Sequence, residues 1–202
     1  MKKSLVNKQI FSMLFAGILI ALILLMTFIP QLGYITINAV PITIIHIPVI
    51  IGGIILGRKY GLILGIVFGL GSMVRSFMEY SLYYAPFTNP LLSVLPRAFI
   101  GFIAFDIHAF FTKLFNNERV AVPFALGLVT LIHSLIVLPL LYWFGTTGFF
   151  FFNDESVFGT DPGLFSFIWG IFVANSLLEI LLAVLIGSPI VYVLKILQEQ
   201  QK

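Results

Sequence analysis

The chain has 202 residues, of which 60% are hydrophobic and only 9% are charged, with a formal net charge of +3. A soluble domain carries about 25% charged residues, so this composition excludes a soluble fold with a single buried core. The surplus apolar surface must face lipid, and the mean hydropathy of +1.11 agrees. The absence of cysteine excludes disulfides and cysteine-ligated metal sites. The composition therefore predicts an all-α, polytopic membrane protein.

Six apolar segments are candidates for transmembrane helices, since each crossing takes roughly 20 residues. The run that follows Lys2, Lys3 and Lys8 is longer than the h-region of a signal peptide and lacks a small-residue cleavage site, so we interpret it as the first helix. The second segment is short and contains Pro41 and Pro48, which predicts an irregular helix. The expected helices are 9–29, 41–57, 60–77, 90–114, 121–144 and 164–195, forming one membrane domain over residues 1–202.

The basic residues gather on one side of this six-helix arrangement. Nine of the 11 Lys and Arg residues fall on that side, whereas the opposite loops carry acidic residues and neither Lys nor Arg. Positive charge marks the cytoplasmic side of a membrane protein. The pattern therefore predicts six transmembrane helices with cytoplasmic N and C termini. The nine residues are Lys2, Lys3, Lys8, Arg58, Lys59, Lys113, Arg119, Lys195 and Lys202.

Small residues recur at four-residue spacing, which lets helix backbones approach closely in a membrane. They either pack the helices of this bundle together or, chiefly on the first helix, form a docking surface for another membrane protein. The glycine series is Gly53, Gly57, Gly61, Gly65 and Gly69. The pairs on the first helix are Ser12 with Ala16 and Gly17 with Ala21.

Polar residues at membrane depth are costly and usually mark function. One group is expected in the outer half of the membrane, below the aromatic loop 78–89 that contains Tyr80 and Tyr84. Its cations and neutral donors would suit a small anionic or strongly polar ligand, because a guanidinium binds a carboxylate through two parallel hydrogen bonds. The group consists of Arg75, Asn89, Ser93, Arg97, His133, Trp169 and Asn175.

Some of the polar residues at membrane depth also have an ordinary structural interpretation. Arg75 could extend to the outer interface, and His46 and His133 could be hydrogen-bonded helix residues. A rise of about 1.5 Å per residue places Asp106 and Glu179 in the inner half, too deep for a site open to the outside. We expect these two carboxylates to form structural pairs or inner-side contacts.

Motifs for enzymatic chemistry are missing from the sequence. There is no H-E-x-x-H and no G-x-x-x-x-G-K-[ST], so any ATP-driven work must be done by a partner. Gly69-Leu70-Gly71-Ser72 is only a scrambled version of the G-x-S-G of intramembrane serine proteases. Two hypotheses remain at this point: a binding and transport subunit without its own ATPase motif, or an intramembrane enzyme of unknown type.

Two stretches resemble the substrate-binding S components of energy-coupling factor (ECF) vitamin transporters. One runs from Ile44 through His46-Ile47-Pro48 and Gly52-Gly53 to Gly71-Ser72; the other is Asn89-Pro90-Leu91-Leu92-Ser93-Val94-Leu95-Pro96-Arg97, followed by Gly101. The second favours the pantothenate type within the family. Pyridoxine, hydroxymethylpyrimidine, riboflavin, folate and queuosine stay open as ligands, because S components share a fold and differ in their pocket side chains.

The resemblance implies a protein of the bacterial cytoplasmic membrane that binds one vitamin from outside, in a pocket formed by the outer halves of the last three helices. Its implied partners are a coupling transmembrane subunit and two cytoplasmic ATPase subunits. No cofactor and no nucleic-acid partner is implied. The family docks through an A-x-x-x-A motif on the first helix, for which Ser12/Ala16 and Gly17/Ala21 are the nearest matches here.

The resemblance and the outer polar group together predict a binding mode. Arg97, or less directly Arg75, binds the ligand carboxylate. Asn89, His133 and Asn175 hydrogen-bond the other polar groups, with Ser93 beside them at the head of the fourth helix. Trp169, Tyr80 and Tyr84 cover the apolar part of the ligand.

Overall fold

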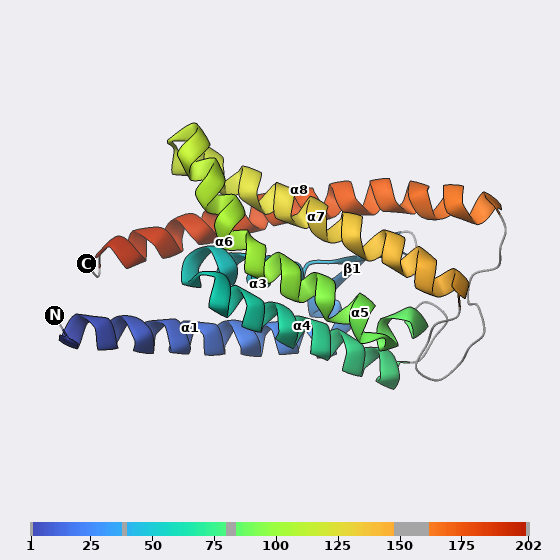
Figure 1. Ribbon diagram of the computed structural model, residues 1–202, viewed down its shortest axis with the longest axis horizontal. Helices are drawn as coiled ribbons and strands as arrows, with labels where there is room; N and C mark the ends of the chain where they lie inside the picture. Colours follow the sequence, from blue (N-terminus) through green and yellow to red (C-terminus); the bar gives the residue numbers. More distant parts are fainter. Residues whose placement is uncertain (1, 38–39, 80–83, 148–161, 201–202) are drawn as a thin grey trace.

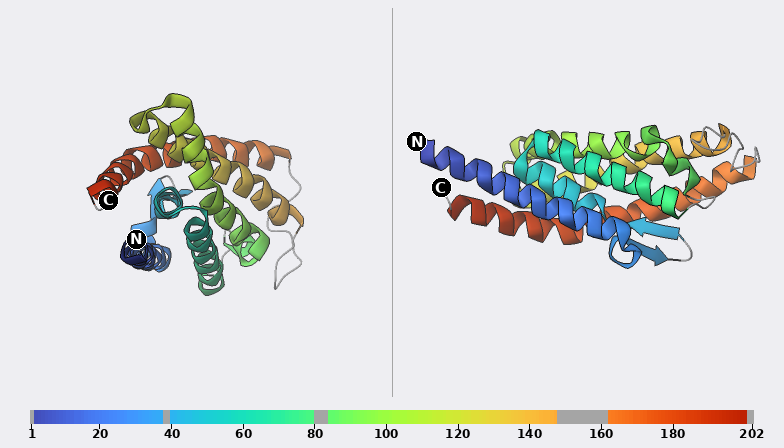
Figure 2. Two further views of the ribbon diagram at one scale, coloured as in Figure 1. Left: turned by 60° about the vertical axis from the view of Figure 1, so that its left-hand side comes forward. Right: turned by 90° about the horizontal axis from the view of Figure 1, so that it is seen from below.

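The computed structural model describes residues 2–37, 40–79, 84–147 and 162–200, with the side chains of 2–8, 30, 35–37, 40–41, 162–169, 171–174 and 199–200 left undescribed. Long helices run side by side along one axis, and both termini lie at the same end (Figures 1 and 2). The elements are α1 (Lys2–Phe28), α2 (Pro30–Gly33), β1 (Tyr34–Ile37), β2 (Val40–Thr43), α3 (His46–Leu56), α4 (Arg58–Met78), the 3₁₀ helix η1 (Ala85–Thr88), α5 (Pro90–Ser93), α6 (Leu95–Phe115), α7 (Glu118–Thr147) and α8 (Pro162–Gln200).

Five helices in the described residues are long and apolar enough to cross a membrane: α1, α4, α5–α6 together, α7 and α8. The expected spans 9–29, 60–77, 121–144 and 164–195 lie within or almost wholly within α1, α4, α7 and α8. The span 90–114 is divided at Val94, between α5 and α6. Pro96 accounts for the division, since it has no N–H to donate to the carbonyl oxygen of Leu92, which accepts from the Arg97 side chain instead.

The expected second helix, 41–57, is wrong in its first part. The strands β1 and β2 instead form an antiparallel pair, the hairpin, in which Tyr34 lies opposite Thr43 and Thr36 opposite Pro41. The β-branched residues of this segment favour strands, and the all-α prediction missed them. The helical remainder, α3, has only 11 residues. Nearly all of it is buried, because it packs against all five longer helices.

Glycines bring α3, α4 and α6 into direct backbone contact. A Cβ added at Gly53 would lie 2.8 Å from the carbonyl oxygen of Gly101, and one added at Gly61 would lie 2.8 Å from the Cα of Gly53. Gly65 and Gly69 face the backbone of residues 93–98 in the same way. Packing within the bundle therefore explains these glycines.

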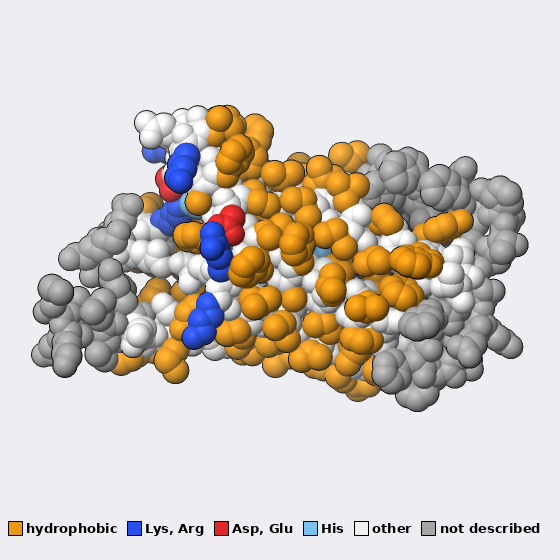
Figure 3. Space-filling model, in the orientation of Figure 1, with side chains coloured by type: hydrophobic (Ala, Val, Ile, Leu, Met, Phe, Trp, Pro, Cys, Tyr) orange, Lys and Arg blue, Asp and Glu red, His pale blue; other side chains and the backbone are white. Residues whose placement is uncertain are grey.

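Charged side chains gather near the end of the bundle that carries the termini, and apolar side chains cover much of the remaining visible surface (Figure 3). Arg58 of α4 pairs with Asp106 of α6, with its Nε 2.9 Å from the carboxylate. Asp106 thus forms the structural pair expected of it. Beside it, Glu118 accepts from Lys195 at 2.6 Å and contacts His108 at 3.0 Å, which ties α6, α7 and α8 together.

Candidate ligand-binding site

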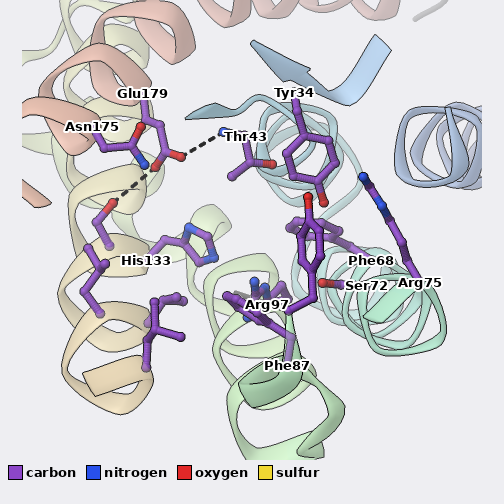
Figure 4. A pocket seen from close by; sticks show the side chains of 15 residues that line it. Tyr34, Thr43, Phe68, Ser72, Arg75, Phe87, Arg97, His133, Asn175 and Glu179 are labelled. Atoms are coloured by element: carbon purple, nitrogen blue, oxygen red, sulfur yellow. Dashed lines mark hydrogen bonds between the residues drawn. The ribbon is translucent and has the colours of Figure 1, made fainter. Parts of the chain in front are cut away.

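A cavity of about 90 Å³ lies in the half of the bundle away from the termini, since its lining includes Arg75 in the last turn of α4 and Arg97 in the first turn of α6. One water needs roughly 10–15 Å³, so the space admits a ligand larger than water. Its walls come from α4, α6, α7, α8, the hairpin and the segment 84–87 (Figure 4). The lining residues are Tyr34, Thr43, Phe68, Ser72, Arg75, Tyr84, Phe87, Arg97, His133, Ser134, Val137, Leu138, Leu141, Asn175 and Glu179.

Arg97 brings a buried cation to this cavity, with only 5% of its surface exposed. It lies in the first turn of α6, and its Nη1 donates to the carbonyl oxygen of Leu92, 2.5 Å away. The guanidinium carbon lies 5.1 Å from the ring centre of Phe87 and 5.5 Å from that of Phe68, within cation–π range. These contacts fix a group with five N–H donors at the cavity wall.

Arg75, the second cation of the lining, is held by several partners. It donates to Glu79 at 2.9 and 3.1 Å and to the carbonyl oxygen of Thr27 at 3.3 Å. The rings of Tyr34 and Tyr84 lie 4.4 and 5.4 Å from its guanidinium carbon. The side chain is buried instead of extending freely to the interface. Arg75 therefore joins α1, α4, the hairpin and the segment before η1.

Tyr34 presents its hydroxyl group from strand β1, outside the membrane-spanning helices. Burial raises the pKa of this phenol above its ordinary value of 10.0, and the nearby Arg75 opposes the rise only in part. The hydroxyl group is therefore protonated near neutral pH and can donate a hydrogen bond into the cavity.

Glu179 lines the cavity, so the expectation that it lies too deep was wrong. Its Oε1 accepts from the backbone N–H of Thr43 at 3.0 Å, and its Oε2 accepts from the Ser134 hydroxyl at 3.4 Å. The reason is the hairpin: because α3 begins only at His46, Thr43 lies at the depth of Glu179, and the cavity reaches down to both. The carboxylate thereby links the hairpin, α7 and α8.

His133 and Asn175 present polar atoms beside Glu179 (Figure 4). Within the part of the chain that the structure describes, both ring nitrogens of His133 and the Oδ1 of Asn175 are buried and form no hydrogen bond. His46 stacks on His133 from behind, with ring centres 5.7 Å apart, and does not line the cavity. Because buried polar atoms are nearly always satisfied, these atoms are available to a ligand or to water.

Asn89 and Ser93, which the sequence placed among the ligand contacts, lie outside the lining. The Oδ1 of Asn89 caps α5 by accepting from the Leu91 N–H at 2.9 Å. The Ser93 hydroxyl donates to the carbonyl oxygen of Gly69, 3.2 Å away on α4. Both residues shape the segment that leads to Arg97. Tyr80 lies outside the described residues, and the side chain of Trp169 is likewise undescribed.

Several lining residues were not anticipated. Ser134, Val137, Leu138 and Leu141 follow His133 at the spacing of one helix face, so the periodicity of α7 could have indicated them. Thr43 and Tyr34 had no comparable signal, because their place at the cavity depends on the hairpin. The cavity thus combines cations, a carboxylate and neutral polar atoms with an apolar wall.

Comparison with protein families matches residues 11–191 to the family described as "ECF transporter, substrate-specific component". The chain belongs to this family. It is therefore an S component, a multi-pass transport subunit of a bacterial membrane, and the hypothesis of an intramembrane enzyme is set aside.

Two curated relatives of this S component have similar lengths. The pantothenic acid transporter PanT of Lactococcus lactis subsp. cremoris is 30% identical over 164 residues, covering 74% of this chain and 75% of that protein. The pantothenate transporter PanT of Leuconostoc mesenteroides subsp. mesenteroides is 29% identical over 180 residues, covering 84% and 85%.

Proposed function

We propose that this S component binds pantothenate in the cavity around Arg97 and delivers it to an ECF importer. The observation that carries the proposal is the buried guanidinium of Arg97 at a cavity whose remaining walls are partly polar and partly apolar. Pantothenate has a carboxylate, an amide, two hydroxyl groups and a geminal dimethyl carbon. The names of the two curated relatives support the same ligand.

The groups of pantothenate match the walls of the cavity. Its carboxylate would bind Arg97 through charge-assisted hydrogen bonds. Arg75 is engaged with Glu79 and two aromatic rings, so we assign it the role of holding the outer wall together. His133 and Asn175 would bind polar groups of the ligand, and Val137, Leu138 and Leu141 would receive the dimethyl carbon. Tyr84, Tyr80 and Trp169 stay proposed as the cover of the site.

Other vitamins are the second candidates, because Phe68, Phe87, Tyr34 and Tyr84 would also accommodate a flat heterocycle. A transport assay distinguishes pantothenate from these other vitamins. Cells without pantothenate uptake of their own, given this chain and an ECF module, should accumulate labelled pantothenate only when both are present. Accumulation of pyridoxine, hydroxymethylpyrimidine, riboflavin, folate or queuosine, with none of pantothenate, would contradict the proposal.

The membrane arrangement that we propose has six crossings, with the short α3 as the second. The end that carries the termini and the basic side chains (Figure 3) would face the cytoplasm, so the cavity lies in the outer half. Residues 1–202 would form a single domain of the bacterial cytoplasmic membrane. Its partners would be a coupling membrane subunit and two cytoplasmic ATPases.

The exposed face of α1 is the proposed contact with the coupling subunit. Ala16 is buried against the rest of the bundle, whereas Gly17 and Ala21 are exposed, and a Cβ added at Gly17 would meet nothing within 4 Å. Small residues in this position leave room for the backbone of a partner helix. Of the two candidate pairs, Gly17 and Ala21 therefore suit docking, and Ser12 with Ala16 suits packing inside the bundle.

Replacing Gly17 with leucine tests this contact. We expect unchanged pantothenate affinity but about tenfold slower uptake, because a bulky side chain would separate the two helices. Ile18→Phe is the matched control, since Ile18 is also exposed and lies about 100° around the helix. Equal uptake by wild type and Gly17→Leu would rule out docking through this face.

A further inference from the structure

The binding mode proposed above assigns no role to one acidic side chain of the cavity, that of Glu179. Glu179 is only 5% exposed and lines the same cavity as Arg97. Figure 4 places the two side chains on different sides of the cavity, with the His133 ring reaching in between them. A ligand lying across the cavity would therefore meet a guanidinium at one end and a carboxyl group at the other.

Glu179 retains capacity to accept hydrogen bonds. A carboxylate offers about four lone-pair sites, and the described residues occupy two of them, through the Thr43 N–H and the Ser134 hydroxyl. Asn175 lies one helical turn before Glu179 and hence on the same face of α8. Its buried Oδ1 has no hydrogen-bond donor among the described residues. The carboxyl oxygens of Glu179 and the Oδ1 of Asn175 thus offer acceptors at this end of the cavity, beside the N–H₂ group of Asn175.

An acceptor-rich end selects for donors on the ligand. A ligand carboxylate placed against Glu179 would bring only further acceptors, and an apolar group there would leave buried lone pairs without partners. A hydroxyl group donates one hydrogen bond without bringing a negative charge, so it suits both Glu179 and Asn175. The cavity is therefore complementary to a ligand with an acid at one end and hydroxyl groups at the other.

We propose that Glu179 is a specificity-determining residue that accepts hydrogen bonds from the hydroxyl groups of the ligand. With Asn175 beside it, it orients the molecule so that the carboxylate points to Arg97 and the hydroxyl end points to α8. This inference rests on the proposed function, since it takes pantothenate as the ligand. The Thr43 and Ser134 contacts hold the carboxylate in place for this role.

The test combines one variant with one ligand analogue. The analogue is N-(3,3-dimethylbutanoyl)-β-alanine, which retains the carboxylate, amide and dimethyl groups of pantothenate but lacks both hydroxyl groups. Titration calorimetry on purified protein should show that wild type binds the analogue at least about tenfold more weakly than pantothenate. Glu179→Gln should weaken pantothenate binding by about tenfold, because an N–H₂ donor replaces one of the two acceptor oxygens.

The affinity of Glu179→Gln for the analogue shows whether Glu179 contacts the ligand hydroxyl groups or only supports the surrounding structure. If Glu179 binds the hydroxyl groups, the substitution changes affinity for the analogue by less than about threefold, so the two losses are not additive. If it only supports the hairpin and α7, both ligands weaken by the same factor, and the proposal is overturned. Ser134→Ala is the control: it removes a donor to Glu179 but retains the carboxyl group, so pantothenate affinity should fall less than in Glu179→Gln.

The titrations of wild-type protein distinguish failure of the proposed function from failure of the proposed role of Glu179. Failure of wild type to bind pantothenate would overturn the proposed function and this inference with it. Normal wild-type binding of pantothenate with equal losses for both ligands in Glu179→Gln would overturn the role of Glu179 alone.

Discussion

Replacing Arg97 with glutamine is expected to lower the affinity for pantothenate by about 10- to 150-fold. The loss of a hydrogen bond to a charged group in a closed site costs on the order of 1.5–3 kcal/mol, and about 1.4 kcal/mol corresponds to tenfold. Arg97 is suited to this role because its buried guanidinium is fixed by Leu92, Phe68 and Phe87 at the wall of the cavity. Calorimetric titration of the purified variant measures the effect.

Two further variants separate binding from folding. Arg97→Lys retains the positive charge and should bind better than Arg97→Gln, although without the two parallel hydrogen bonds of a guanidinium. Arg75→Gln should lower the melting temperature, because Arg75 holds Glu79, Tyr34 and the Thr27 carbonyl together. Its affinity should fall less than that of Arg97→Gln. Wild-type affinity in a folded Arg97→Gln protein would remove Arg97 from the site.

Gly61→Ala is expected to destabilise the protein by at least about 3 kcal/mol, the upper range for overpacking. The added Cβ would collide with the carbonyl group of Gly101 on α6 and lie 2.8 Å from the Cα of Gly53 on α3. Both obstacles are backbone, so relief requires two helices to move instead of one side chain to turn. Thermal unfolding in detergent, compared with wild type, measures the loss.

Gly127→Ala is the matched control for this substitution. Gly127 also lies inside a helix, but a Cβ there would approach the Ile180 and Val184 side chains at 3.6 and 3.8 Å, ordinary contact distances. Since alanine is favoured over glycine in helices by roughly 0.5–1 kcal/mol, this variant should be neutral or slightly stabilised. Equal melting temperatures for the two variants would show that the close backbone contact between α3, α4 and α6 is not needed for stability.

The long helices could be predicted because each is a long apolar segment with few charges. The hairpin could not, since Tyr34–Ile37 and Val40–Thr43 become strands only by pairing with each other. α3 shows the limit of hydropathy: its 11 residues are apolar because other helices surround them, which gives the same composition as contact with lipid. Composition alone does not distinguish these two environments.

Site residues could be predicted where the depth of a residue along its own helix was enough to place it at the cavity. Arg97, His133 and Asn175 were identified in this way, and all three line the cavity. Glu179 was misjudged because its position depends on Thr43, a residue of the unanticipated hairpin. Asn89 and Ser93 have side chains suited to ligands, yet their hydrogen bonds go to the Leu91 N–H and the Gly69 carbonyl. Residue type and depth do not show where such bonds are directed.

We expect this chain by itself to bind pantothenate in the cavity around Arg97. Calorimetric titration of the purified chain, without an ECF module and without ATP, tests it most directly. We expect one pantothenate per chain, saturable binding, and no displacement by pyridoxine, riboflavin or folate at equal concentration. Absence of heat with pantothenate, together with saturable binding of one of the other vitamins, would contradict the claim.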